Sequence, residues 1–122
     1  MGHKTLIAPL VLSLTMALGC QATTDSNDST PTVEELLTRV NSGDLNMLFE
    51  LGTRYANGDG VSRDNVLAYK WFGLAAEFLN SEKRFQAQRM QQLLDGEMFR
   101  HQIAEANRLA RLWKIKHPPT NN

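Results

Sequence analysis

The stretch LGTRYANGDGVSRDNVLAYKWFGLAAE, residues 51–77, contains two amphipathic segments separated by a glycine-rich turn. In the second segment, apolar residues recur at the i, i+3, i+4 and i+7 spacing that places them along one face of a helix. The first segment carries a shorter stripe of the same kind, formed by Leu51, Gly52 and Tyr55. The stretch therefore predicts two helices that fold back on one another.

The turn between these segments, NGDGVSRD at residues 57–64, is rich in residue types that hold ligands. A calcium loop starting at Asn57 would place Ala68 at the twelfth position, where such a loop needs a bidentate Glu. A phosphate loop needs Gly-Lys-Ser/Thr after a strand, and this stretch has neither feature. We therefore predict a chain reversal in which Gly58 and Gly60 take positive φ and Asp64 caps the next helix.

Helical periodicity continues on both sides of this hairpin. Thr32 and Glu35 have the spacing of a capping box, and Gly43 follows the helix that they begin. The paired prolines in HPPTNN, residues 117–122, end the last helix and begin a tail that we expect to be disordered. The sequence thus predicts an all-α domain over residues 32–116 with about five helices, at residues 32–43, 45–57, 64–79, 81–94 and 97–116.

A weak internal repeat relates these helices. Shifting the sequence by 35 positions places Val33 over Ala68, Leu36 over Trp71 and Leu37 over Phe72. A period between 20 and 50 residues is typical of stacked helical hairpins, in which each unit buries its apolar face against the next.

The hairpin resembles the Sel-one-like repeat, whose pattern is LGxxYxxGxGVxxDxxxAxxWFxxAA. The resemblance implies a short TPR-like α/α solenoid, a right-handed stack of helical hairpins that acts as a protein-interaction scaffold. Residues 102–113 look like the closing helix of such proteins. The matching residues, which the resemblance assigns to the structure of the repeat, are Leu51, Gly52, Tyr55, Gly58, Gly60, Val61, Asp64, Ala68, Trp71, Phe72, Ala75 and Ala76.

The first residues, MGHKTLIAPLVLSLTMALGCQ, have the layout of a secretory signal: a short basic start, an apolar stretch and small residues. The apolar stretch is shorter than the roughly 20 residues that span a bilayer. MALGC resembles the lipobox of bacterial lipoproteins, although Ala17 stands where the family usually has Leu. The resemblance implies cleavage after a signal at residues 1–19, fatty acylation of Cys20 and an envelope protein that faces the periplasm.

An ordinary cleaved signal with an incidental cysteine is the alternative to lipidation. Cys20 is the only cysteine in the chain, and a lone exposed thiol is a liability in an oxidising compartment, which favours lipidation. Residues 20–31 are polar and lack large apolar side chains, so we expect a flexible tether between the anchor and the helices.

Charge is distributed unevenly along a chain whose formal net charge is zero. Residues 25–64 hold eight acids and three basic residues, whereas residues 65–122 hold five acids and nine basic residues. A nucleic-acid-binding protein would need a stronger net positive field. We therefore expect no nucleic-acid partner, and the resemblance to the Sel-one-like repeat implies a protein partner.

Residues capable of catalysis do not form a recognisable motif. His101 and His117 have no acid or cysteine at metal-ligand spacing, and no nucleophile elbow is present. We expect no enzymatic activity, no metal or cofactor and no small-molecule substrate. The resemblance favours an envelope scaffold, with an immunity or inhibitor protein against a toxic effector as the alternative and a cell-wall enzyme as a weaker one.

Side chains outside the apolar stripes are the candidates for partner binding, and beside the turn these are Glu50, Arg54, Asn57 and Asp59. The last helix has a second polar surface. We favour a solvated face there, with contact to anionic lipid headgroups or an acidic partner as the alternative; its basic residues are Arg100, Arg108, Arg111, Lys114 and Lys116.

Overall fold

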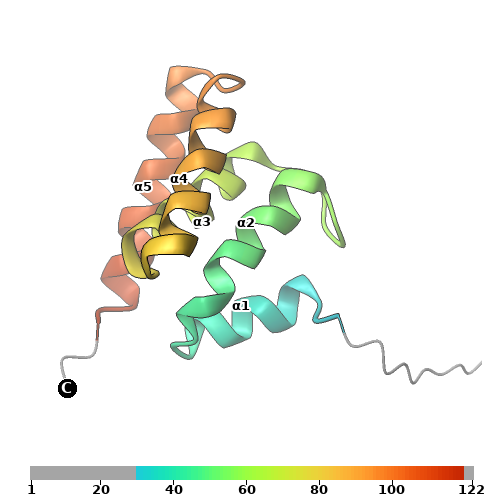
Figure 1. The fold of residues 1–122 in the computed structure, drawn as a ribbon, viewed down its shortest axis with the longest axis vertical. Coiled ribbons are helices and arrows are strands. Elements are labelled where there is room, and N and C mark those ends of the chain that lie inside the picture. Colours follow the sequence, from blue (N-terminus) through green and yellow to red (C-terminus); the bar gives the residue numbers. More distant parts are fainter. Residues whose placement is uncertain (1–29, 120–122) are drawn as a thin grey trace, which may run out of the picture. The chain divides into compact units, whose positions relative to one another are not determined.

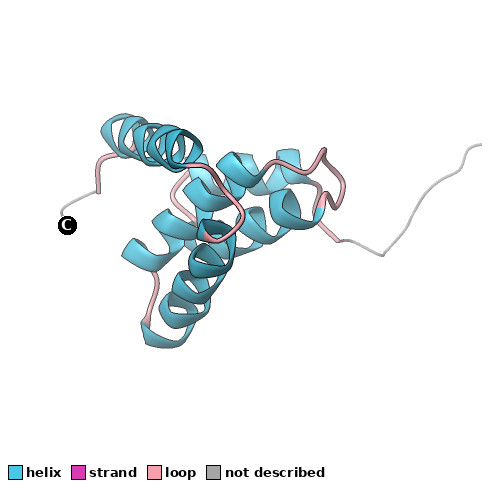
Figure 2. Ribbon diagram, turned by 90° about the horizontal axis from the view of Figure 1, so that it is seen from above, coloured by secondary structure: helices cyan, strands magenta, loops and turns pink. Residues whose placement is uncertain are grey.

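The computed structural model describes residues 30–119, which form five α-helices packed together and one short 3-10 helix. The described residues contain helices and loops and no strand, which confirms the all-α prediction (Figures 1 and 2). The predicted signal, Cys20 and most of the tether lie outside the described residues. The elements are α1 (Val33–Asn41), η2 (Leu45–Met47), α2 (Leu48–Asn57), α3 (Asn65–Phe78), α4 (Ser81–Asp95) and α5 (Arg100–Lys116).

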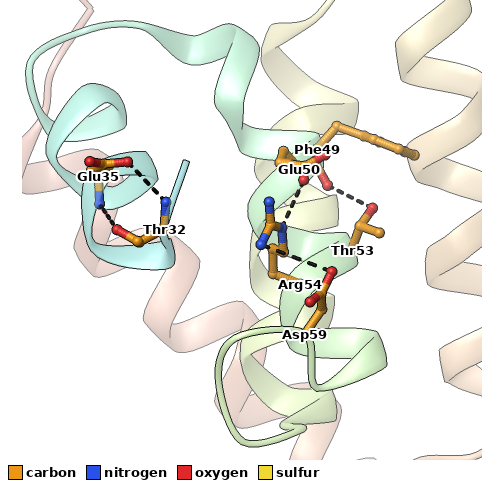
Figure 3. Close-up of polar contacts among 7 residues, drawn as sticks. All are labelled: Thr32, Glu35, Phe49, Glu50, Thr53, Arg54 and Asp59. Atoms are coloured by element: carbon orange, nitrogen blue, oxygen red, sulfur yellow. Dashed lines mark hydrogen bonds and ion pairs between the residues drawn. The ribbon is translucent and has the colours of Figure 1, made fainter. Parts of the chain in front are cut away.

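Side-chain caps begin two of these helices, as the sequence predicts. At α1, the backbone N–H of Glu35 donates to Thr32 Oγ1 at 3.2 Å, and the N–H of Thr32 donates to Glu35 Oε2 at 3.0 Å (Figure 3). At α3, the N–H of Leu67 donates to Asp64 Oδ1 at 3.0 Å. Each cap satisfies amides that have no partner inside the helix.

Two predicted helix starts were too early. Residues 45–47 form a 3-10 turn before α2, and the Asp44 side chain accepts a hydrogen bond from the N–H of Asn46 at 3.3 Å. α5 begins at Arg100 because Phe99 has an extended backbone, with φ −80° and ψ 155°. Gln102 Oε1 then accepts from the N–H of Phe99 at 2.9 Å, a contact that takes the place of a helical hydrogen bond.

The loop between α2 and α3 is a chain reversal, which confirms that prediction. Gly58 and Gly60 have φ of 69° and 76°. This backbone conformation costs glycine little free energy and other residues much more. The backbone N–H of Asp59 donates to the carbonyl of Arg54, and that of Asp64 donates to the carbonyl of Tyr55, both at 2.9 Å. These bonds tie the loop back to the end of α2.

Helix α3 is the central element, since α2, α4 and α5 all pack on it, while α1 packs on α2 (Figure 1). The buried core runs through every helix. Its largest fully buried side chains are Phe72, Leu36, Leu48, Leu51, Leu74 and Val40.

Among the described helices, none combines the length and the apolar character that a membrane span requires.

Each neighbour of α3 contacts it through a different group. Gly52 of α2 faces the ring of Phe72, so that the two backbones approach closely. The side-chain amide of Gln91 in α4 donates to the carbonyl of Tyr69 at 3.3 Å. Trp113 of α5 packs edge-on against the rings of two α3 residues, with centroids 6.1 Å from Trp71 and 6.4 Å from Phe78.

Replacing Gly52 with alanine is expected to destabilise the fold by about 1–3 kcal/mol, the usual cost of forcing a methyl group into a packed core. An ideal Cβ at Gly52 would lie 2.7 Å from two carbon atoms of the Phe72 ring, so ring and backbone would have to separate. Urea denaturation gives the change in the free energy of unfolding.

The matched control is Gly73→Ala in α3. A Cβ there meets the side-chain amide of Gln91, 2.8 Å from Nε2, and a flexible side chain can move away. The higher helix propensity of alanine, worth up to about 1 kcal/mol, offsets the lost contact. Equal stabilities for the Gly52→Ala and Gly73→Ala proteins would contradict the assigned role of Gly52.

Candidate functional site

Three of the four residues that the sequence places beside the turn form an ion-pair cluster at the end of α2: Glu50 and Arg54 of the helix and Asp59 of the following loop. Arg54 Nε lies 2.8 Å from Glu50 Oε1, and Arg54 Nη1 lies 3.9 Å from Asp59 Oδ2 (Figure 3). The Arg54 side chain is only 8% exposed, whereas those of Glu50 and Asp59 are 45% and 69% exposed. The guanidinium is thus enclosed by the fold, with both carboxylates on its solvent side.

Arg54 therefore stabilises the end of α2 more than it offers a surface to a partner. Its pKa is raised, first by the hydrogen bond to Glu50 and then by the negative charges of Glu50 and Asp59, against the opposing effect of burial. A charged arginine at this depth needs both its hydrogen bond and its counter-charges. Of the four candidate residues, Asn57 and Asp59 are exposed, and Glu50 is partly exposed.

The residues shared with the repeat pattern lie mostly inside the fold. The pKa of Tyr55 is raised by burial and, to a smaller extent, by the charge of Asp64, so the phenol is held neutral. The glycines of the turn are exposed. The buried members are Leu51, Gly52, Ala68, Trp71, Phe72 and Ala75, and the partly buried ones are Tyr55, Val61, Asp64 and Ala76.

A groove of about 430 Å³ lies where the end of α1 meets the ends of α3 and α5. Apolar side chains form most of its walls, and polar groups lie at its margins. We call it the α1/α5 groove; its lining residues are Val40, Asn41, Ser42, Gly43, Leu45, Phe78, Trp113, Lys116, His117, Pro118 and Pro119.

Trp113 holds the two sides of the α1/α5 groove together. Its indole Nε1–H donates to Asn41 Oδ1 at 3.3 Å, which joins α5 to the last residue of α1. His117 stacks on the same indole with a centroid separation of 4.5 Å, and its Nδ1 lies 2.9 Å from the Trp113 carbonyl oxygen. His117 is thus half-buried against the helix end, although the sequence places it in a solvated tail.

Two lysines give this region a positive charge. Lys116 lines the α1/α5 groove, and Lys70 Nζ lies 4.1 Å from the centroid of the Trp71 ring. Burial and, to a smaller extent, the charge of Lys116 lower the pKa of Lys70. Within residues 30–119 neither ammonium takes part in an ion pair. The two positive charges repel each other, and a carboxylate placed beside them would reduce that repulsion.

Sequence reasoning did not find the α1/α5 groove. It placed Trp113 in the last helix and the residues around Ser42 at the end of the first helix, but local patterns do not show that these two parts of the chain meet. The hydrogen bond between Asn41 and Trp113 spans 72 positions in the sequence. The signal in the sequence was a pair of polar residues, Asn41 and Ser42, next to apolar Val40 at a helix end. This pattern is common at ordinary helix termini and does not by itself indicate a groove.

Within the described range, no three His, Cys, Asp or Glu side chains gather as a metal site would require. The comparisons with known proteins add no relative: no protein-family model, no curated protein and no solved structure matches the chain.

Glu50→Gln is expected to lower the free energy of unfolding by about 1–2 kcal/mol, because it removes a charged hydrogen-bond partner from a buried guanidinium. The matched variant Asp59→Asn should change it by less than about 0.5 kcal/mol, since that pair is long and exposed. Urea titrations of both proteins measure the difference. A larger loss for Asp59→Asn than for Glu50→Gln would contradict the assigned order of the two contacts.

Proposed function

We propose that this protein is a lipid-anchored scaffold of the bacterial envelope that binds a partner protein in the α1/α5 groove. The observation that carries the proposal is the groove itself, an apolar recess with unpaired lysine charge at one side. Its volume lies within the range of roughly 300–1,000 Å³ typical of ligand sites. We infer that it receives one or two side chains from a short protein segment.

The walls favour an apolar anchor residue in that segment. Val40, Phe78 and Trp113 are contributed by three different helices, so the recess exists only when all three are packed. Filling it would remove apolar surface from water without any change in the fold. Aromatic walls of this kind are common where a few residues carry most of the binding energy.

The lysines favour an acidic residue beside that anchor. Lys116 lies at the groove, and Lys70 is near enough to be affected by its charge. A carboxylate on the partner beside Lys116 would compensate its ammonium group, which takes part in no ion pair in the described part of the chain. The proposed ligand is therefore a partner segment with an apolar side chain next to an Asp or Glu.

The anchor and the repeat architecture belong to the same proposal. The lipobox-like sequence supports acylation of Cys20, which would hold the helices at the membrane and raise their local concentration there. The matching pattern over residues 51–77 supports α2 and α3 as one Sel-one-like hairpin. The close packing of Gly52 on Phe72 is what such a hairpin needs.

Reversing the charge beside the groove is expected to weaken capture of the partner. A photo-crosslinking amino acid at exposed Ser42 should yield a discrete adduct in envelope extract, and Lys116→Glu should reduce that adduct at least tenfold. Arg89→Glu on α4 is the matched charge reversal and should leave the adduct unchanged. Equal adduct yields in the Lys116→Glu and Arg89→Glu proteins would argue against the α1/α5 groove as the binding site.

The anchor is tested separately by cell fractionation. Cys20→Ala should move the protein from the membrane fraction to the soluble fraction, because the proposed acylated thiol is lost. Gln21→Ala, next to it, should leave the protein in the membrane fraction. Retention of the Cys20→Ala protein in membranes after a high-salt wash, which releases proteins held mainly by charge, would refute lipidation and leave the groove proposal untouched.

A further inference from the structure

The side of α5 that faces solvent combines basic and apolar side chains. Positions 104, 108, 111 and 115 follow the 3.6-residue repeat and lie in one line along the helix, opposite buried Ala106 and Trp113. Figure 1 shows α5 along one side of the helical unit. We call this surface the α5 outer face, formed by Arg100, Ala104, Arg108, Arg111, Leu112 and Ile115, all of which are exposed.

Two large apolar side chains on this face remain in water. Ile115 is 74% exposed and Leu112 is 41% exposed. Single exposed apolar residues are common on proteins and by themselves indicate nothing. Ile115, however, lies at the C-terminal end of a row of basic residues on the same face, one helical turn beyond Arg111 and two beyond Arg108. The pattern is a row of cations that ends in exposed apolar side chains.

The charge of this face is positive although the chain as a whole is neutral. Glu105 is the acid on this side of α5, and it is already paired with Arg108 through two contacts of 2.7 and 2.8 Å. Arg100 and Arg111 take part in no ion pair within the described residues. Two guanidinium groups are thus available to anions outside the protein.

We propose that the α5 outer face rests on an anionic phospholipid bilayer, with Ile115 and Leu112 among the acyl chains and Arg100 and Arg111 on the lipid phosphates. An interfacial helix of this kind uses apolar burial together with attraction to anionic headgroups. The contact is made by α5 alone and does not depend on Cys20 or on the α1/α5 groove. It would set how the helical unit is oriented at the membrane.

The shape of the face favours a bilayer over an acidic protein. A stable protein interface buries about 800 Å² on each partner, which a strip one helix wide does not readily supply. The residues of this face line neither the α1/α5 groove nor the ion-pair cluster on α2. A fluid bilayer needs no shaped recess, because its lipids adapt to a convex helix.

The test follows the local environment of residue 115 in the full chain. Cys20→Ser removes the only cysteine and the proposed acylation site, so Ile115→Cys then provides a unique attachment point for a polarity-sensitive fluorophore. Vesicles that contain phosphatidylglycerol should shift its emission to the blue, whereas pure phosphatidylcholine vesicles should not. The same fluorophore at Gln86→Cys, an exposed α4 position, should not respond to either.

Neutralising arginines of the α5 outer face measures how much their charge contributes to vesicle binding. A basic side chain near an anionic surface strengthens binding about fivefold, so Arg100→Gln with Arg111→Gln should lower the partition coefficient roughly 25-fold. The charge-matched control is Arg84→Gln with Arg89→Gln on α4. This pair should reduce the partition coefficient far less. Circular dichroism spectra of both proteins check that the helices are retained.

Three outcomes would overturn the proposal. These are an absent shift with phosphatidylglycerol, an equal shift with pure phosphatidylcholine, and equal losses for the α5 and α4 arginine pairs. Soluble polyglutamate serves as the competing ligand. A shift at residue 115 with polyglutamate but not with vesicles would assign the α5 outer face to an acidic protein partner instead.

Discussion

The ring of Phe72 lies directly against the backbone of Gly52, and the arrangement of the other helices depends on this close approach. It brings α3 against α2 at a distance that a side chain on Gly52 would not allow. Phe49 then packs edge-on against the same ring, with centroids 5.3 Å apart. With one side fixed on α2, α3 uses its remaining sides to hold α4 and α5.

The α1/α5 groove is an indirect result of that packing. Trp71 and Phe78 lie on α3 where they meet Trp113, and Trp113 in turn donates a hydrogen bond to Asn41. The recess is therefore built from residues that have a structural task in the core, and its shape follows from the helix positions. The α5 outer face differs, because its exposed side chains contribute little to the packing of the fold.

Sequence reasoning succeeded where the physical cause is local. The helix of residues 65–78, its Asp64 cap and the reversal at Gly58 and Gly60 all follow from neighbouring residues. It did not foresee the burial of Arg54, because a polar residue at the edge of an apolar stripe is enclosed only when the following loop folds back. It also missed the apolar character of the α5 outer face, where Ile115 follows Arg108 and Arg111 along one side of the helix.

The two tryptophans of the chain are both nearly buried and lie together, one on α3 and one on α5. Their ring centroids are 6.1 Å apart, and their planes meet at 76°. The electronic transitions of two indoles at this distance and angle couple with each other. The resulting near-ultraviolet circular dichroism therefore reports on the contact between α3 and α5. Separation of α5 from the rest would alter the near-ultraviolet circular dichroism even while every helix stayed intact.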